Sequence, residues 1–241
     1  MDKGLEIIQR DLGLEELSLT QRLLHLRVYF AGLIGLLLFL TAEARIGNSS
    51  ESPFCTETKE CLLYDLLCQT DDYEVRHYDA AKWVTTDEES YVFDKATYTA
   101  FMRLFKYING SNNDGVKIDM TAPVIIKVQE KKRIWQSAIY TLSFLLPSAY
   151  QNDPPQPTDN KVYFTDLPDM KVYARTYGGY MVSLTTAYNS MQLKKQLDRA
   201  QASYNTEYYY AVGYDSPMKI MNRHNEVWYI AEGEPVCPSS P

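Results

Sequence analysis

Residues 93–108 constrain the fold of this 241-residue chain more than any other stretch, because their side chains repeat at the period of one α-helix. Counted from the first, the repeating positions are i, i+3, i+4, i+7, i+8, i+11, i+12 and i+15, namely Phe93, Ala96, Thr97, Ala100, Phe101, Leu104, Phe105 and Ile108. This stripe predicts an amphipathic helix that buries one face against another layer. Asn109 and Gly110 follow it, and these residue types commonly end a helix.

Stretches rich in aromatic and β-branched residues surround this helix and predict strands. We expect strands within 73–86 (kinked near 79–80), 116–128, 137–146, 171–177, 180–184, 208–214 and 226–231. A second helix is expected to begin near Thr185 or Thr186, either of which is a good N-terminal cap. Residues 147–160 contain four prolines and predict a surface loop. This order of elements predicts the α+β class, with a largely antiparallel sheet, two packed helices and two related halves.

An uninterrupted apolar run lies near the N-terminus, at residues 28–40. A helix of that length spans roughly 20 Å, which is less than the ~30 Å hydrocarbon core of a bilayer. Small residues follow at Ala42 and Ala44, as at a signal-peptide cleavage site. We therefore expect residues 1–44 to be a signal peptide and the protein to be secreted. The long stretch before the run leaves two alternatives, an uncleaved single-pass membrane anchor and a buried core helix.

Features beyond residue 44 agree with export. Asn48 and Asn109 each begin an N-glycosylation sequon. All four cysteines follow the expected cleavage site, at Cys55, Cys61, Cys68 and Cys237. An even number of cysteines in an exported chain predicts disulfides, with three possible pairings. Residues 45–61 are polar and predict a linker, while the tail 233–241 is expected to be disordered unless Cys237 is bridged.

The charge of the chain limits the kinds of partner that we expect it to bind. The formal net charge is −7, and the longest basic cluster is Lys131-Lys132-Arg133, which we expect at a hairpin tip. A nucleic-acid-binding protein normally carries a dense basic patch. Nucleic acid is therefore not an expected partner, and a membrane is expected only if the N-terminal segment is an uncleaved anchor.

Three separated blocks carry a resemblance to a known family. They are residues 73–78 (YEVRHY), residues 107–110 with 118–124 (YING, IDMTAPV), and residues 213–217 with 222–228 (GYDSP, NRHNEVW). In order and spacing, residues 62–232 resemble the SOUL haem-binding family. The resemblance implies a barrel-like α+β domain with a pseudo-two-fold arrangement. It also implies reversible, non-covalent binding of haem or another tetrapyrrole, with no catalysis.

The candidate ligand-binding residues follow from the resemblance and from the chemistry of haem. Haem offers a broad apolar face, an iron that accepts imidazole, and two anionic propionates. In the subgroup of the family that keeps Arg-His-Tyr on its first strand, the histidine is a proposed axial ligand, and it matches His77 here. The other candidates are Arg76, Arg103 and Lys106 near the propionates, and Phe101 and Phe105 against the ring.

These candidates also have ordinary structural interpretations. Strand alternation puts Tyr73, Val75 and His77 on one face, and Glu74, Arg76 and Tyr78 on the other. A lone strand histidine is commonly a surface residue, and the two phenylalanines belong to a stripe that predicts core packing. The two helix cations can simply be solvated. His224, in the last matched block, is expected to be structural.

The sequence leaves two other classes of function as alternatives. No G-x-S-x-G nucleophile motif or Gly-rich phosphate loop is present, so we expect no enzyme, although a binder or hydrolase of another small hydrophobic molecule stays an alternative. The second alternative is a protein-interaction module, because Leu193-x-x-x-Leu197-Asp198 loosely resembles a BH3 segment. Core packing explains that spacing more simply.

Overall fold

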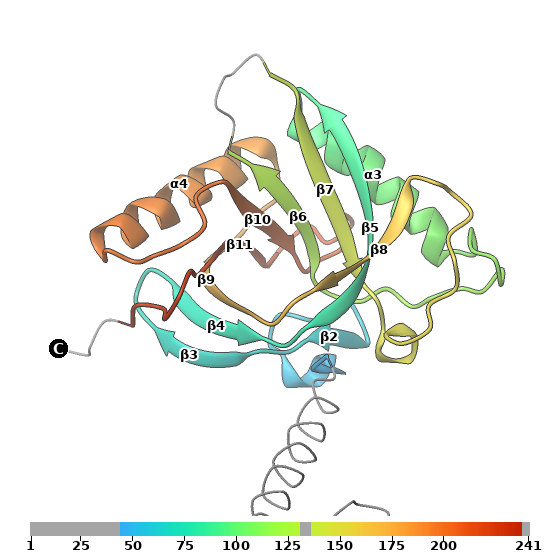
Figure 1. Cartoon of the computed structure of the whole chain (residues 1–241), viewed down its shortest axis with the longest axis horizontal. Helices are drawn as coiled ribbons and strands as arrows, with labels where there is room; N and C mark the ends of the chain where they lie inside the picture. Colours follow the sequence, from blue (N-terminus) through green and yellow to red (C-terminus); the bar gives the residue numbers. More distant parts are fainter. Residues whose placement is uncertain (1–43, 131–135, 238–241) are drawn as a thin grey trace, which may run out of the picture. The chain divides into compact units, whose positions relative to one another are not determined.

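The computed structural model describes residues 44–130 and 136–237 (Figure 1). The expected signal segment with its apolar run, the basic cluster at 131–133 and the last four residues all lie outside the described residues. Within the described residues, no helix is both long enough and apolar enough to cross a membrane.

Nine strands form one large antiparallel sheet. They are β3 (Asp65–Gln69), β4 (Glu74–Tyr78), β5 (Ala81–Ser90), β6 (Val124–Gln129), β7 (Ala138–Leu145), β8 (Val162–Leu167), β9 (Met170–Tyr177), β10 (Tyr208–Gly213) and β11 (Asn225–Ile230). Their order is β3-β4-β9-β11-β10-β6-β7-β5-β8, so β3 and β8 are the two edges. The sheet curves like a barrel without closing (Figure 1). The predicted α+β class is confirmed.

Two helices pack on this sheet. The predicted first helix is confirmed as α3 (Phe93–Ile108), which packs against β5 and β7 and buries Ala96, Ala100 and Leu104 completely. The second, α4 (Ser183–Arg199), packs against β9 and β11. One residue of the predicted apolar stripe is not buried against the sheet. Phe105 is 41% exposed, because Leu104 and Ile108 occupy the positions against the sheet.

The sequence-based strand predictions differ from the structure in several places. Of the strand expected over 116–128, only the part from Val124 onward is a strand, β6. The long strand expected over 73–86 is two strands, β4 and β5, which pair with different neighbours on either side of the turn at 79–80. The strand expected at 180–184 is wrong, because the backbone turns there (Val182 N–H donates to the Tyr180 carbonyl at 3.0 Å) and α4 begins at Ser183. The edge strand β8 was not predicted, since its sequence gives no clear apolar alternation and its side chains are mostly only partly buried or exposed.

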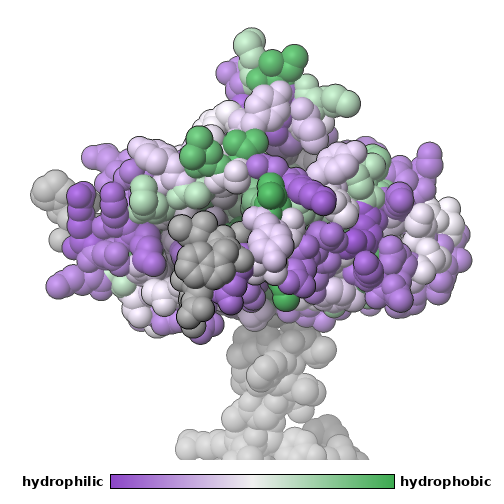
Figure 2. Space-filling model, turned by 90° about the horizontal axis from the view of Figure 1, so that it is seen from above, coloured by the Kyte–Doolittle hydropathy of each residue, from purple (hydrophilic) through white to green (hydrophobic). Residues whose placement is uncertain are grey.

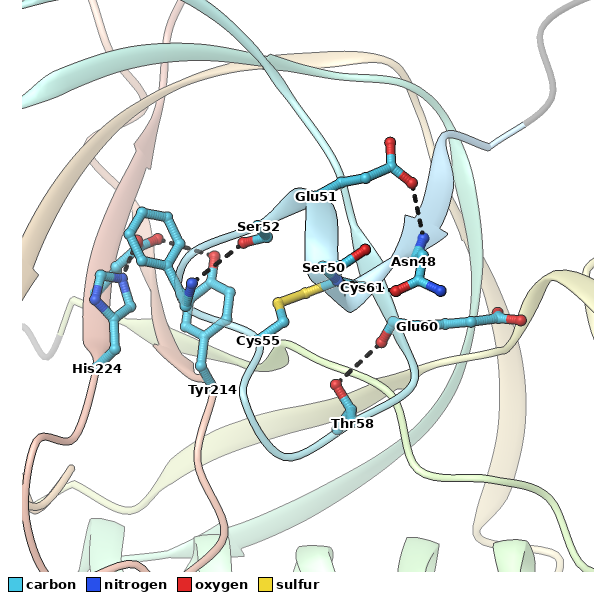
Figure 3. Close-up of a disulfide and its surroundings, with 12 residues drawn as sticks. Asn48, Ser50, Glu51, Ser52, Cys55, Thr58, Glu60, Cys61, Tyr214 and His224 are labelled. Carbon is cyan, nitrogen blue, oxygen red and sulfur yellow. Dashed lines mark hydrogen bonds and ion pairs between the residues drawn. A yellow bond between two sulfur atoms is a disulfide. The ribbon is translucent and has the colours of Figure 1, made fainter.

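The segment expected to be a linker, residues 45–61, is folded. Strand β1 (Ile46–Asn48) pairs with β2 (Glu60–Leu62), and the 3-10 turn η1 (Ser49–Glu51) lies between them. A disulfide joins Cys55 and Cys61, both of which are buried (Figure 3). A polar segment is a linker only when nothing anchors it to the domain. Here the Cys55–Cys61 disulfide anchors it.

The cysteine pairing, which the sequence left open, is now defined. The second disulfide joins Cys68 of β3 to Cys237, with 5.9 Å between the two Cα atoms. The Val236 N–H also donates to the Tyr173 hydroxyl at 2.9 Å. The tail is therefore attached to the sheet as far as residue 237. It was expected to be disordered unless Cys237 is bridged, and Cys237 is bridged.

The sheet is buried on both faces, which explains why its central strands are apolar almost throughout. One face packs against α3 and α4 through residues such as Val75, Phe144 and Tyr229. The opposite face forms a second core with Trp83, Val172, Trp228 and the two cysteines of the N-terminal disulfide. The N-terminal segment thus covers the face that the helices leave free.

The two predicted glycosylation sites are at the surface. Asn48 and Asn109 are both exposed, the first as the cap of η1 and the second at the end of α3. Their side chains already make local hydrogen bonds, from the Ser50 N–H to Asn48 and from Asn109 to the Phe105 carbonyl. Glycosylation itself stays a prediction.

Candidate functional site

A groove of about 570 Å³ lies where α3, α4 and the sheet meet. Its floor comes from the sheet and the start of α3, and its rim comes from α4 and from the residues between β5 and α3. Such a volume falls within the range of ordinary small-molecule sites, roughly 300–1,000 Å³.

The floor of the groove is aromatic. Phe93 and Tyr140 are buried and meet edge to face, with their ring centroids 5.6 Å apart. Tyr209 of β10 lies beside them and is also buried. Burial raises the pKa of Tyr209 to about 12. Its phenol is therefore neutral at physiological pH, and it adds no charge to an apolar floor.

The rim carries more varied chemistry. Met191 and Lys194 lie three residues apart on α4, so their side chains are neighbours on one helix face. Met191 is 47% exposed, and Lys194 makes no ion pair or hydrogen bond with any described residue. The carboxylate on the rim, Glu130, already accepts a hydrogen bond from the Tyr229 hydroxyl at 3.0 Å. The groove thus combines an apolar floor with a thioether and a cation that has no described partner.

The groove belongs to a surface on which apolar residues are not rare. On the face shown in Figure 2, hydrophobic patches reach the surface between hydrophilic ones. Among the exposed apolar residues, Tyr91, Val92 and Met191 line the groove. Exposed apolar side chains that border a concave site are typical of ligand binding.

The predicted propionate partner Arg76 lies elsewhere, sealed on the face opposite the helices. It is completely buried, and its Nη1 donates to Glu226 at 2.9 Å while its Nε donates to Glu74 at 2.7 Å. Glu226 also accepts from the Trp228 indole at 2.6 Å and from the Tyr214 hydroxyl at 3.2 Å. Arg76 therefore neutralises an internal carboxylate, and it does not face a ligand on the surface.

This buried pair has a defined electrostatic balance. Burial alone raises the pKa of Glu226, but the charge of Arg76 and the bonds from His224 and Trp228 outweigh it, so the pKa is lowered overall. The glutamate stays ionised, as a buried charge does only when it is paired and hydrogen-bonded. Its role is structural.

The N-terminal segment covers this buried pair. Phe54 stacks on the His224 imidazole, with centroids 3.9 Å apart and an interplanar angle of 9°. The guanidinium of Arg76 lies 4.2 Å from the ring centroid of Tyr64. Figure 3 shows His224 and Tyr214 beside the segment that contains the disulfide. His224 also lies 2.6 Å from Glu226, a contact that agrees with the structural role expected of it.

The predicted axial ligand His77 faces carboxylates. Its Nε2 lies 2.6 Å from Asp169 and its Nδ1 lies 3.7 Å from Asp65. The hydrogen bond with Asp169, aided by the nearby charges, raises the pKa of the imidazole. His77 is not part of the groove. Strand alternation did place it correctly, on the face of β4 opposite to Arg76.

The four candidates on α3 separate into two groups. Phe101 stacks on Phe105 at 5.9 Å and meets Phe144 at 5.1 Å, and exposed Lys106 follows in sequence. Arg103 turns away, because its guanidinium donates to Glu88 at 2.7 Å and to Thr86 at 2.6 Å. The structure therefore leaves Phe105 and Lys106 exposed on α3, while Phe101 is partly buried against the core and Arg103 is held in ion-pair and hydrogen-bond contacts with β5.

Sequence reasoning missed Met191 and Lys194. They lie on the exposed side of α4, where no apolar stripe draws notice, and only the packing of the two helices shows that they border a groove. The BH3-like leucines of the same helix are different. Leu193 and Leu197 are completely buried, so core packing explains them, as the simpler interpretation predicted.

The fold and these residues agree with the comparisons to known proteins. The family model described as "SOUL heme-binding protein" matches residues 59–230. The chain therefore belongs to the SOUL heme-binding protein family.

Particular relatives define the match further. The chain is 38% identical to human heme-binding protein 2 over 167 residues, which cover 69% of this chain and 82% of that protein. It is 35% identical to heme-binding protein 1 of Xenopus laevis over 158 residues, 66% of this chain and 83% of that one. A solved structure, the EcmrR–DNA complex, matches with a TM-score of 0.50 at 9% identity, over 95% of this chain and 77% of that chain. This last likeness concerns the fold alone.

Proposed function

We propose that this protein binds haem or a related tetrapyrrole reversibly in the groove between α3 and α4, as a carrier or buffer that catalyses no reaction. One observation carries the proposal. The groove has an aromatic floor of suitable size, and its rim presents a thioether and a cation without a described partner. Membership of the SOUL family supports tetrapyrrole as the ligand class.

The residues of the groove fit the three parts of haem. Phe93, Tyr140 and Tyr209 supply a neutral apolar surface for the ring face. Lys194 can pair with one propionate, while the other stays in water. Haem supplies an iron that accepts protein ligands, and methionine is a known axial ligand in proteins. Met191 is the residue of the rim that can serve in this way.

The surroundings of His77 fit the macrocycle less well. Its neighbours across the sheet are Asp65 of β3 and Lys171 of β9, and Asp169 is in direct contact. A carboxylate cluster repels propionates and gives no apolar wall for the ring. Ligation of haem by His77 stays a prediction, which the titration below tests.

A second placement on α3 has its own observation in support. The stacked rings of Phe101 and Phe105, the latter 41% exposed, form a small aromatic surface next to Lys106. A planar ligand could lie against it. We keep this as the second candidate site for the same ligand.

Export is part of the proposal. Two disulfides support it, because such bonds persist in oxidising compartments and are rare in the cytosol. Digestion of protein from secreting cells with a glycosidase tests it. A mobility shift that is lost in Asn48→Gln or Asn109→Gln is expected, and an unmodified cytosolic protein would contradict it.

Haemin titration followed by absorbance tests the binding proposal. We expect saturable one-to-one binding, weakened several-fold by Lys194→Gln and changed in its Soret band by Met191→Leu. Met218→Leu is the matched control, because Met218 is 88% exposed and lies outside the groove. Absence of saturable binding contradicts the haem proposal.

The same titration separates the candidate sites. Loss of affinity only in Phe105→Ala moves the ligand to α3. Loss of a histidine-ligated Soret band only in His77→Ala restores the prediction made from the sequence. Equal effects of Met191→Leu and its control contradict the groove.

A further inference from the structure

The pairing register of β4 with β9 brings a histidine and two aspartates together. His77 pairs with Lys171 and Tyr78 pairs with Met170. The paired register ends there, with Asp79 directly after β4 and Asp169 directly before β9. His77, Asp79 and Asp169 meet at this end of the two strands, where each offers a ligand atom within 4.8 Å of the others.

This arrangement places two like charges close together. Neighbouring carboxylates repel each other, and a cation held between them favours their charged forms. Asp79 makes no ion pair or hydrogen bond with a described residue, and the described partner of Asp169 is His77. Lys171, which pairs with His77 in the register, forms an ion pair with Glu234 at 3.0 Å instead. Lys171 therefore does not balance the two aspartates.

The imidazole is oriented as in known metal sites. Its Nε2 faces Asp169, while its Nδ1 faces Asp65 of the neighbouring strand at 3.7 Å. Asp65 is itself held by an ion pair with Arg45. A histidine that binds a metal through one nitrogen commonly donates its other N–H to a carboxylate, which fixes the ring. Asp65, held by Arg45, lies on the Nδ1 side of the ring at 3.7 Å, just beyond hydrogen-bond distance.

From this geometry we propose a binding site for a divalent first-row transition-metal ion, held by His77 Nε2 and by carboxylate oxygens of Asp79 and Asp169. One imidazole and two carboxylates are ligands that Zn²⁺ accepts, with water completing the coordination. Magnesium and calcium prefer oxygen ligands alone. His77 and Asp79 are only partly buried and Asp169 is exposed, so the ion can enter from solvent. In binding, it replaces the proton shared by His77 and Asp169.

The proposal does not depend on the haem proposal, because the groove and this cluster have no residue in common. The two fail separately. Zinc binding requires no tetrapyrrole, and the variants of the groove leave His77, Asp79 and Asp169 intact.

Calorimetric titration of the untagged, metal-free chain with ZnCl₂ near pH 7.5 tests it. We expect saturable one-to-one binding, weakened at least tenfold by Asp79→Asn and by Asp169→Asn. Asp166→Asn is the matched control. Asp166 lies just before Asp169, pairs with Lys82 and is outside the cluster, so its loss changes net charge equally. Thermal unfolding without zinc checks that each variant is folded.

Nuclear magnetic resonance of the imidazole protons gives a second measurement. Zinc is expected to shift the signals of His77 and leave those of His224, which stacks on Phe54, unchanged. Three results overturn the proposal: no saturable heat, equal weakening by Asp79→Asn and Asp166→Asn, or His77 signals that respond to pH but not to zinc. The last result would mean that a proton alone balances the aspartates.

Discussion

Arg76 and His77 are neighbours in the sequence, but they lie in two regions with opposite chemistry. Arg76 is sealed with Glu226 under the N-terminal segment, where nearly every charge has several partners. His77 points to the other side of β4, where carboxylates outnumber the cations that face them. The comparison teaches that a charge satisfied inside the protein maintains the fold, whereas an unbalanced charge near solvent is available to a ligand.

The largest loss of stability is expected from Glu226→Gln. It leaves Arg76 with the partly exposed Glu74 as its remaining described counter-charge, and removing one member of a buried pair costs about 3–5 kcal/mol of unfolding free energy. Asp169→Asn at the surface is expected to cost less than about 1 kcal/mol. Urea denaturation measures both. Similar losses in the two variants would show that the buried pair has no special role.

A double variant tests whether the charge or the shape of the buried pair matters more. Arg76→Met with Glu226→Leu removes both charges and is expected to recover much of the stability, because buried pairs replaced by apolar residues are often tolerated. Failure to recover would mean that the shape of the pair, with its bonds to Tyr78, Tyr214 and Trp228, matters more than its charge.

A smaller loss is expected from Phe54→Ala, which removes the ring that covers His224 and Arg76. Phe54 is only partly buried, so we expect a cost of about 1–2 kcal/mol from lost apolar burial. Urea denaturation measures it, with Phe105→Ala on the other face as the control. Faster hydrogen exchange at the Trp228 indole should accompany the loss if Phe54 acts as a cover.

The smallest effects are those of pH, and the two regions differ in sign. The pKa of Glu226 is lowered from 4.5, so the unfolded chain binds more protons and this contribution is lost as pH falls below about 4.5. The pKa of His77 is raised from 6.5, so its contribution is complete below 6.5 and is lost as pH rises through the raised value. Denaturation of His77→Gln across pH 5–9 should show a flatter alkaline limb. An unchanged limb would contradict the coupling of His77 to its aspartates.

The sequence predicted the parts of this protein that depend on period and on residue type. The stripe from Phe93 to Ile108 predicted α3, and strand alternation separated His77 from Arg76 before any coordinates were known. The class of fold followed from the order of such elements. These features are local, and a short window of sequence contains all the information that they need.

Features that depend on distant pairing were not predictable. The partner of Arg76 lies 150 residues away, at Glu226, and no spacing rule connects them. Asp79 and Asp169 come together only through the β4–β9 register. Polar composition suggested a linker at 45–61, but a disulfide and a packed ring fold that segment. The groove was missed for the same reason, because it requires the packing of α3 beside α4.

The disulfide between Cys68 and Cys237 makes most of the domain a closed covalent ring, because its two cysteines are separated by 169 in the sequence. A protease that cuts once within this ring therefore releases no fragment, and both parts stay in one molecule until the bond is reduced. Under the proposed export, such a ring would turn a single cut from an irreversible loss into damage that the remaining contacts can tolerate.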